Sequence, residues 1–200
     1  MNRQEQGYLW LGLSMLVATA TAVAAFEMAV PDRPAVVDAL TATGQLALLI
    51  FMIPLFARPL RTLLRIPLTA TLMRIRRNAG IAYGGVQVVH LVLVTWMFIS
   101  LSDPPTETAM VIVGGTGLLL SMVMLWTSFD QPARRIGPKY WRWIHQAGFF
   151  NFMLIYLYDF LFEPLLLDAP VSHPVYVAAL LLGVVLRTVC RVRTRFAGAT

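Results

Sequence analysis

The chain has 200 residues, of which 58% are hydrophobic and 13% are charged. Soluble domains usually carry about a quarter charged residues, so this composition excludes an ordinary soluble domain and predicts an integral membrane protein in contact with lipid. The formal net charge is +6, but the basic residues gather in particular connections and tails, which is typical of membrane orientation and argues against a nucleic-acid partner. Cys190 is the only cysteine, which excludes an intrachain disulfide and a cysteine-built zinc or iron–sulfur site.

Six predominantly apolar stretches of about membrane length predict six spanning helices. They cover residues 8–30, 36–57, 78–102, 108–129, 140–162 and 175–190. Prolines and short polar segments separate them, because a proline cannot continue a helix. The expected fold is therefore all-α: a single bundle of six transmembrane helices that occupies residues 1–200.

The distribution of charge predicts the orientation of this bundle. Basic residues gather in the N-terminus, residues 58–77, residues 130–142 and the C-terminal tail, which all fall on one side of a six-span protein. Cytoplasmic segments carry the excess of Lys and Arg, so both termini are expected in the cytoplasm. The opposite connections hold the acidic residues Asp32, Asp38, Asp103, Glu107, Glu163 and Asp168.

The connection at residues 58–77 separates the second and third predicted spans. Within it, Ile66–Met73 is too short to cross a membrane. An apolar piece of this length between arginines is expected to lie in the membrane interface. The six arginines of the connection are Arg58, Arg61, Arg65, Arg74, Arg76 and Arg77.

Two histidines lie within the predicted spans. His90 follows Arg77 by thirteen residues, about 20 Å along a helix, and His145 follows Arg142 by three, about 5 Å. The bilayer core offers an imidazole no water, so each ring needs a protein partner or a ligand. The two depths differ by about 15 Å, which predicts two haem levels and argues against one shared iron.

Other interpretations of these histidines stay open at this point. A lone histidine inside a membrane helix is often a hydrogen-bonding residue between helices, which is the alternative for His90. His145 lies beside Trp141 and Trp143, so it could instead be a residue at headgroup level within an aromatic belt.

Tyr158 is thirteen residues beyond His145 and lies at the outer level of the fifth predicted span. A tyrosine oxygen can ligate haem iron, although His, Met and Cys are commoner ligands. Asp159 follows directly, and a carboxylate at that depth suggests a polar partner or a wet cavity.

Glycines gather in the third and fourth predicted spans. Gly80 and Gly84 are four residues apart on one helix face, where they either let a neighbouring helix approach or leave room for a flat macrocycle. The run from Gly114 to Gly117 lacks the lysine of a phosphate loop and follows no strand, so close helix packing is the expected role.

Two segments carry a resemblance to a known family. The first, residues 72–91, has the pair Arg76 and Arg77, then Gly80 and His90. The second, residues 127–145, reads Thr-Ser-Phe-Asp, then Arg-Arg-Ile-Gly, then Trp-Ile-His. Both resemble the ferric-reductase-like transmembrane family. Within it, the chain is most similar to the haem-binding membrane subunit of the bacterial protein-methionine-sulfoxide reductase system.

The resemblance implies a multi-pass protein of the bacterial inner membrane that binds one or two haem b groups and passes electrons across the membrane. His90 and His145 match the haem histidines of the family, and Arg77 matches an arginine expected near the inner haem. Electrons would come from a cytoplasmic flavin reductase or from quinol, and would leave to a periplasmic reductase subunit. FMN and quinone are further candidate cofactors. The chain is expected to be an electron-transfer subunit of an oxidoreductase system rather than a complete enzyme.

Tyr158 departs from the family pattern, which places another haem histidine at this position. Either the outer haem has a different sixth ligand, or its iron is five-coordinate, or only one haem binds. An alternative function follows from the same departure: a non-redox structural or assembly protein of this fold that has lost one or both haems.

Overall fold

The computed structural model describes residues 2–29, 33–102, 108–162 and 174–197. These residues form α1 (Arg3–Glu27), α2 (Ala35–Leu64), α3 (Pro67–Ser100), α4 (Thr108–Trp126), α5 (Asp130–Leu157), the π-helix η1 (Tyr158–Phe162) and α7 (Pro174–Ala197). The described part of the chain contains no strand, which confirms the all-α prediction. His173 and the acidic residues at 32, 103, 107, 163 and 168 lie outside the described residues.

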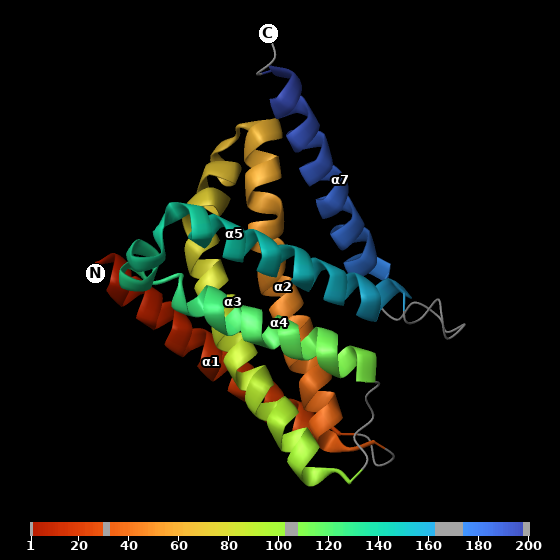
Figure 1. The fold of residues 1–200 in the computed structure, drawn as a ribbon. Coiled ribbons are helices and arrows are strands. Elements are labelled where there is room, and N and C mark those ends of the chain that lie inside the picture. Colours follow the sequence, from red (N-terminus) through yellow and green to blue (C-terminus); the bar gives the residue numbers. More distant parts are fainter. Residues whose placement is uncertain (1, 30–32, 103–107, 163–173, 198–200) are drawn as a thin grey trace.

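The helices α1, α2 and α3 pack extensively on one another, and α4 and α5 run across them (Figure 1). The helix α7 lies against α2 and the end of α5. Phe51 of α2 lies at the centre of the core, where its ring contacts the rings of Tyr83, Phe149, Phe152 and Tyr156. These contacts join α2, α3 and α5 into one core.

The connection between α2 and α3 differs from the prediction. Only Arg65 and Ile66 separate the two helices, and no separate interfacial piece forms at residues 66–73. Arg65 adopts the left-handed conformation that ends a helix, and Pro67 occupies the first turn of α3, where its missing N–H costs nothing. Arginine is also a good helix former. The basic residues therefore extend both helices beyond the apolar stretches instead of forming a loop.

The start of α5 also differs from the prediction of a basic loop at residues 130–139. This segment is helical, with a break at Gly137, whose φ of 76° and ψ of 164° lie outside the helical region. Such a positive φ favours glycine, and Pro138 follows directly, at a position where it can restart a helix. At its other end, α5 stops at Leu157 and continues as η1, where the prediction had a regular helix to residue 162.

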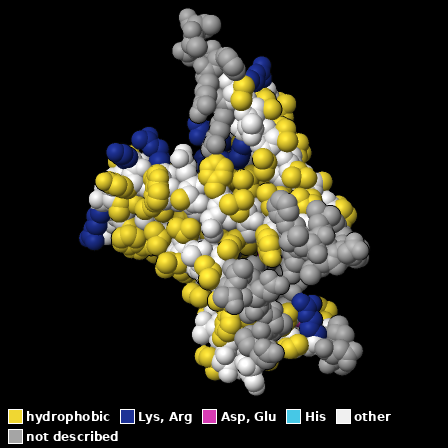
Figure 2. Space-filling view, turned by 45° about the vertical axis from the view of Figure 1, so that its right-hand side comes forward, with side chains coloured by type: hydrophobic (Ala, Val, Ile, Leu, Met, Phe, Trp, Pro, Cys, Tyr) yellow, Lys and Arg dark blue, Asp and Glu magenta, His cyan; other side chains and the backbone are white. Residues whose placement is uncertain are grey.

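Three helices, α1, α2 and α3, are long and apolar enough to cross a membrane. The α4 and α5 helices pass this test only as a pair that is bent by 112°, which gives up to four candidate spans among the described residues. The apolar part of α7, Pro174–Cys190, is shorter. Hydrophobic side chains cover the middle of the face in Figure 2, with basic side chains mainly toward its upper left and top. The protein is therefore a membrane protein, whereas the number of six spans stays a prediction.

Arg187 fixes α7 on α2 by satisfying backbone carbonyls. Pro59 has no N–H to donate to the carbonyl of Leu55, one helical turn earlier. The Nε of Arg187 donates to that carbonyl at 3.2 Å, and its Nη2 donates to the carbonyl of Pro54 at 2.9 Å. The guanidinium also lies 3.7 Å above the ring centroid of Phe149. An arginine of the last helix thus compensates a proline in the second, as polar groups in an apolar environment require.

We expect Arg187→Met to lower the free energy of unfolding by about 1.5 to 3 kcal/mol, the contribution of hydrogen bonds from a charged donor. The measurement is thermal or denaturant unfolding in detergent, with Thr188→Val as the matched control, because that hydroxyl bonds only within its own helix. In a Pro59→Ala background, Arg187→Met should lower the free energy of unfolding by less. The backbone N–H of residue 59 then donates to the carbonyl of Leu55. An equal cost in both backgrounds would contradict this explanation.

Candidate functional site

A cavity of about 740 Å³ opens where α2 ends and where α3 and α5 begin. Its volume falls within the range of roughly 300–1,000 Å³ that small-molecule and cofactor sites occupy. Aromatic and apolar side chains form its walls, and arginines gather at its mouth. The apolar walls include Phe51, Met124, Leu125, Phe149, Phe150 and Phe152.

The glycines of α3 resolve into two roles. A Cβ at Gly84 would lie 2.8 Å from Cδ1 of Leu125, so this glycine lets α4 approach α3 closely. A Cβ at Gly80 would meet nothing within 4 Å, and Gly80 lines the cavity. Close helix packing is therefore found at Gly84, whereas the open space beside Gly80 leaves room for a flat macrocycle as a prediction.

The glycine run in α4 shows the same division. Gly117 packs closely, because a Cβ there would lie 2.6 Å from Cδ1 of Ile155 in α5. Within the part of the chain that the structure describes, Gly114 and Gly115 have no neighbour within 4 Å of that position. The prediction of close helix packing thus holds at Gly117 and is wrong for the two preceding glycines.

His145 lies in the wall of the cavity, on α5. Its ring stacks on the indole of Trp141, with centroids 4.2 Å apart and planes 27° apart. Its Nε2 lies 3.1 Å from the hydroxyl oxygen of Thr127, the residue that follows α4. The indole N–H of Trp141 donates to the Thr127 carbonyl at 2.9 Å. The imidazole is therefore held in place by a stacking partner and a hydrogen-bond partner.

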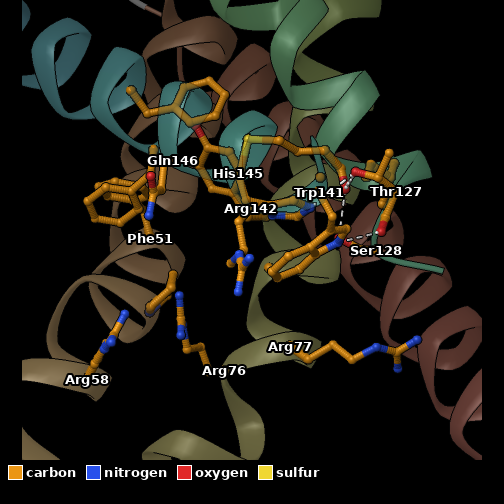
Figure 3. A pocket seen from close by; sticks show the side chains of 18 of the residues that line it. Phe51, Arg58, Arg76, Arg77, Thr127, Ser128, Trp141, Arg142, His145 and Gln146 are labelled. Atoms are coloured by element: carbon orange, nitrogen blue, oxygen red, sulfur yellow. Dashed lines mark hydrogen bonds between the residues drawn. The ribbon is translucent and has the colours of Figure 1, made fainter. Parts of the chain in front are cut away.

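Three arginines point into the open space of the cavity. Figure 3 shows the side chains of Arg58, Arg76 and Arg142 directed toward the same space from α2, α3 and α5. Within the described residues no acidic side chain forms an ion pair with any of them. Guanidinium groups that converge without a counter-charge repel one another, and an anion relieves that repulsion. The mouth of the cavity is therefore suited to carboxylate or phosphate groups.

Arg77 lines the cavity but is engaged elsewhere. Its Nη2 lies 3.6 Å from the carboxylate of Asp130, and its Nη1 donates to the backbone carbonyl of Arg3 at 3.1 Å. Its side chain points away from the other three arginines in Figure 3. Arg77 of α3 thus ties the beginnings of α1 and α5 to α3 beside the cavity.

The other two predicted site residues lie outside this cavity. His90 lies on α3 and faces α2, where its Nδ1 is 2.9 Å from the hydroxyl oxygen of Thr43. Tyr158 is the first residue of η1. The structure therefore brings His145 and Arg77 to one cavity, and leaves His90 and Tyr158 in other surroundings.

A buried polar network next to the cavity was missed by the sequence-based reasoning. The amide of Gln87 donates to the hydroxyl oxygen of Tyr83 at 2.9 Å, and the hydroxyl of Tyr156 donates to the same atom at 3.3 Å. The signal was present, because Tyr83 and Gln87 are one helical turn apart inside an apolar span. Arg187, which also lines the cavity, was overlooked although it lies within the last predicted span.

Residues 39–156, more than half of the chain, match the family described as ferric reductase like transmembrane component. The chain belongs to this family. The family generally binds haem and flavin-related cofactors, and membership indicates a membrane electron-transfer component. The matched segment includes Arg77, His90 and His145 and ends two residues before Tyr158. No curated protein and no solved structure gives a significant match to the chain.

The described residues do not gather the ligands of a bare metal ion at one place. Among them, no group of three or more His, Cys, Asp and Glu side chains is placed to hold an ion. A haem iron, by contrast, needs only one or two protein ligands, because the macrocycle supplies the other four.

Gly84→Ala and Gly80→Ala form a matched pair on one helix face. We expect Gly84→Ala to lower the free energy of unfolding by about 1 to 3 kcal/mol, because its Cβ overlaps Leu125. Gly80→Ala should be neutral or stabilising by up to about 1 kcal/mol, since its Cβ enters open space and alanine is the better helix former. Unfolding in detergent measures both, and equal losses would show that the two glycines do not differ in packing.

Proposed function

We propose that the protein is a haem b-carrying transmembrane electron-transfer subunit of six spans with both termini in the cytoplasm. It passes electrons from a cytoplasmic flavin reductase or quinol to a periplasmic acceptor, for which a methionine-sulfoxide reductase is the candidate. The observation that carries the proposal is the cavity that joins His145, aromatic walls and the arginines Arg58, Arg76 and Arg142, which have no acidic partner among the described residues. This cavity lies in a member of a family that generally binds haem.

The residues of the cavity fit a haem b group. Haem b is a flat apolar macrocycle with an iron at its centre and carboxylates at one edge. His145 offers an imidazole for the iron, the phenylalanines offer an apolar enclosure, and the arginines at the mouth offer partners for the carboxylates. The amphipathic character of the cavity thus matches that of the cofactor.

Bound haem would supply one-electron redox chemistry, and the chain sets the conditions for it. Phe149 and Phe152 keep water from the inner wall of the cavity. Trp141 restrains the ring of His145 by stacking. The positive charge of the arginines at the mouth would stabilise the reduced state of a bound haem, and it would therefore raise the reduction potential.

His90 is the residue we assign to the outer haem. It lies on α3 and faces α2, where its Nδ1 is 2.9 Å from the hydroxyl oxygen of Thr43. The family pattern supports this role, because the matched segment contains His90. Tyr158 remains the candidate for the opposite ligand at the outer level. FMN and quinone remain candidate cofactors, because the positive mouth would also attract a flavin phosphate.

A second function is favoured by one specific observation. Both histidines hydrogen-bond to a threonine on another part of the bundle, as a purely structural histidine would. The alternative is therefore a structural or assembly protein of this fold that has lost one or both haems. The presence or absence of haem in the purified protein separates the two functions.

We expect the protein from haem-replete cells to show a Soret band and an α-band in a reduced-minus-oxidised spectrum. His90→Ala and His145→Ala should each remove part of the absorbance independently, because the two residues lie in different surroundings. Elution as a monodisperse species in size-exclusion chromatography controls for misfolding. A protein without either band would refute the haem proposal, and complete loss from either single variant would indicate one shared haem.

Tyr158→His tests the outer ligand. A histidine at this position restores the family pattern, so we expect a larger low-spin six-coordinate signal in the absorption or electron paramagnetic resonance spectrum. Tyr156→His is the comparison, because Tyr156 is buried against Phe51 and Tyr83. If Tyr158→His leaves the spin state unchanged, residue 158 is not the outer ligand position.

Arg76→Gln tests the mouth of the cavity. Removing one positive charge should weaken haem retention and lower the midpoint potential by roughly 20 to 60 mV, the one-electron equivalent of about 0.5 to 1.4 kcal/mol. Arg74→Gln is the matched control, since Arg74 is exposed, bonds to Thr71 and does not line the cavity. Equal shifts in both variants would indicate a general surface-charge effect instead of a local one.

A further inference from the structure

The two histidines present opposite ring nitrogens to their threonine partners. Nδ1 of His90 faces Thr43 at 2.9 Å, whereas Nε2 of His145 faces Thr127 at 3.1 Å. The ring atom that stays available therefore differs between the two sites, and this decides how each histidine can bind an iron.

The hydroxyl hydrogens of the threonines are already committed. Thr43 donates to the carbonyl of Ala39 at 2.8 Å, and Thr127 donates to the carbonyl of Val123 at 2.8 Å. Both threonines are buried, with 0% of their surface exposed. A hydroxyl has one hydrogen, so a threonine that donates it within its own helix accepts from the histidine ring through its oxygen.

This assignment fixes the tautomer of each neutral imidazole. His90 carries its hydrogen on Nδ1 and has its lone pair on Nε2, while His145 carries its hydrogen on Nε2 and has its lone pair on Nδ1. Within the described residues, no hydrogen bond involves Nε2 of His90 or Nδ1 of His145. Each ring thus has one nitrogen that is free to act as a ligand.

The two free nitrogens are not equivalent toward a macrocycle. Nε2 lies at the end of the ring that is far from Cβ, so the helix that carries the histidine does not obstruct it. Nδ1 is bonded next to the carbon that carries Cβ, so a macrocycle approaching it meets the backbone of the same helix. Histidines that bind metals usually donate the other ring N–H to a fixed acceptor, and Thr43 is such an acceptor for His90.

We propose that Thr43 is the positioning residue that holds His90 ready to bind haem iron through Nε2, and that Thr127 turns Nε2 of His145 away from this role. His145 then binds iron through Nε2 only after its bond to Thr127 breaks. This inference rests on the proposed haem function. The inference implies that His90 is already oriented to bind iron. His145, by contrast, can bind iron only when its hydrogen bond to Thr127 is broken.

The tautomers can be measured directly in the haem-free full-length protein. The chain has only three histidines, so nitrogen-15 NMR of histidine-labelled protein in detergent resolves their ring signals. The variants His90→Gln and His145→Gln assign these signals to individual residues. The expected result is an unprotonated Nε2 in His90 and an unprotonated Nδ1 in His145. The same tautomer in both rings, or the reverse pair, would overturn the inference.

Titration with haemin tests the consequence. It uses two threonine variants that we expect to differ in their effect on haem affinity. Thr43→Val should weaken binding of added haemin at His90 about tenfold and shift the midpoint potential of that site, as expected on losing a partner of the ligand. Thr127→Val should leave binding at His145 unchanged or strengthen it about two- to tenfold, since a competing hydrogen bond is lost. Thr43→Ser, which keeps the hydroxyl, should restore the wild-type values.

Thr41→Val is the matched control, because that hydroxyl lies two residues from Thr43 and bonds only within α2, to the carbonyl of Val37. Haem binding that is unchanged in Thr43→Val, or weakened equally in Thr127→Val, would overturn the inference and leave the haem function standing. No haem binding by the wild-type protein would refute the proposed function as well.

Discussion

Polar groups in the apolar part of this protein have to find their partners within the chain, because the membrane offers none. This constraint decides which helices are neighbours. Arg187 joins α7 to the carbonyls around Pro59 in α2, Thr43 joins α2 to His90 in α3, and Tyr156 joins α5 to Tyr83 in α3. Hydrophobic packing alone would tolerate several arrangements of such helices, since lipid is as apolar as a leucine side chain. The hydrogen bonds make one arrangement preferable.

The same constraint separates the arginines into two groups. Arg77 and Arg187 are bound to carbonyls or to Asp130, and they hold helices together. Arg58, Arg76 and Arg142 instead converge on the cavity without an acidic partner in the described part of the chain. An arginine of the first group cannot be removed without exposing polar backbone atoms, whereas one of the second group acts mainly through its charge. Positive charge at the mouth of an apolar cavity is therefore a property of the site and not of the fold.

Sequence patterns predicted the helical class and the involvement of His145 and Arg77 in one region, but they misplaced helix ends. Hydropathy reports which residues suit lipid, so the basic residues 58–77 were read as a connection although they continue α2 and α3. The cavity could not be predicted, because it depends on which neighbour each residue meets. Gly80 and Gly84 have equivalent sequence surroundings, and only the position of Leu125 shows that one is packed and the other is open.

At the outer end of α5, counting residues along a helix predicts the depth of a residue but not the direction of its side chain. A regular α-helix rises about 1.5 Å per residue, so the depth of Tyr158 relative to His145 follows from the sequence. The direction of its side chain does not, because the chain changes from α- to π-helical geometry at that residue. The matched family segment ends at residue 156, at nearly the same place. Turns of π-helix often occur at functional sites, and this one begins two residues after the matched segment ends. Counting along the chain therefore gives the depth of residue 158 but not the direction in which its side chain points.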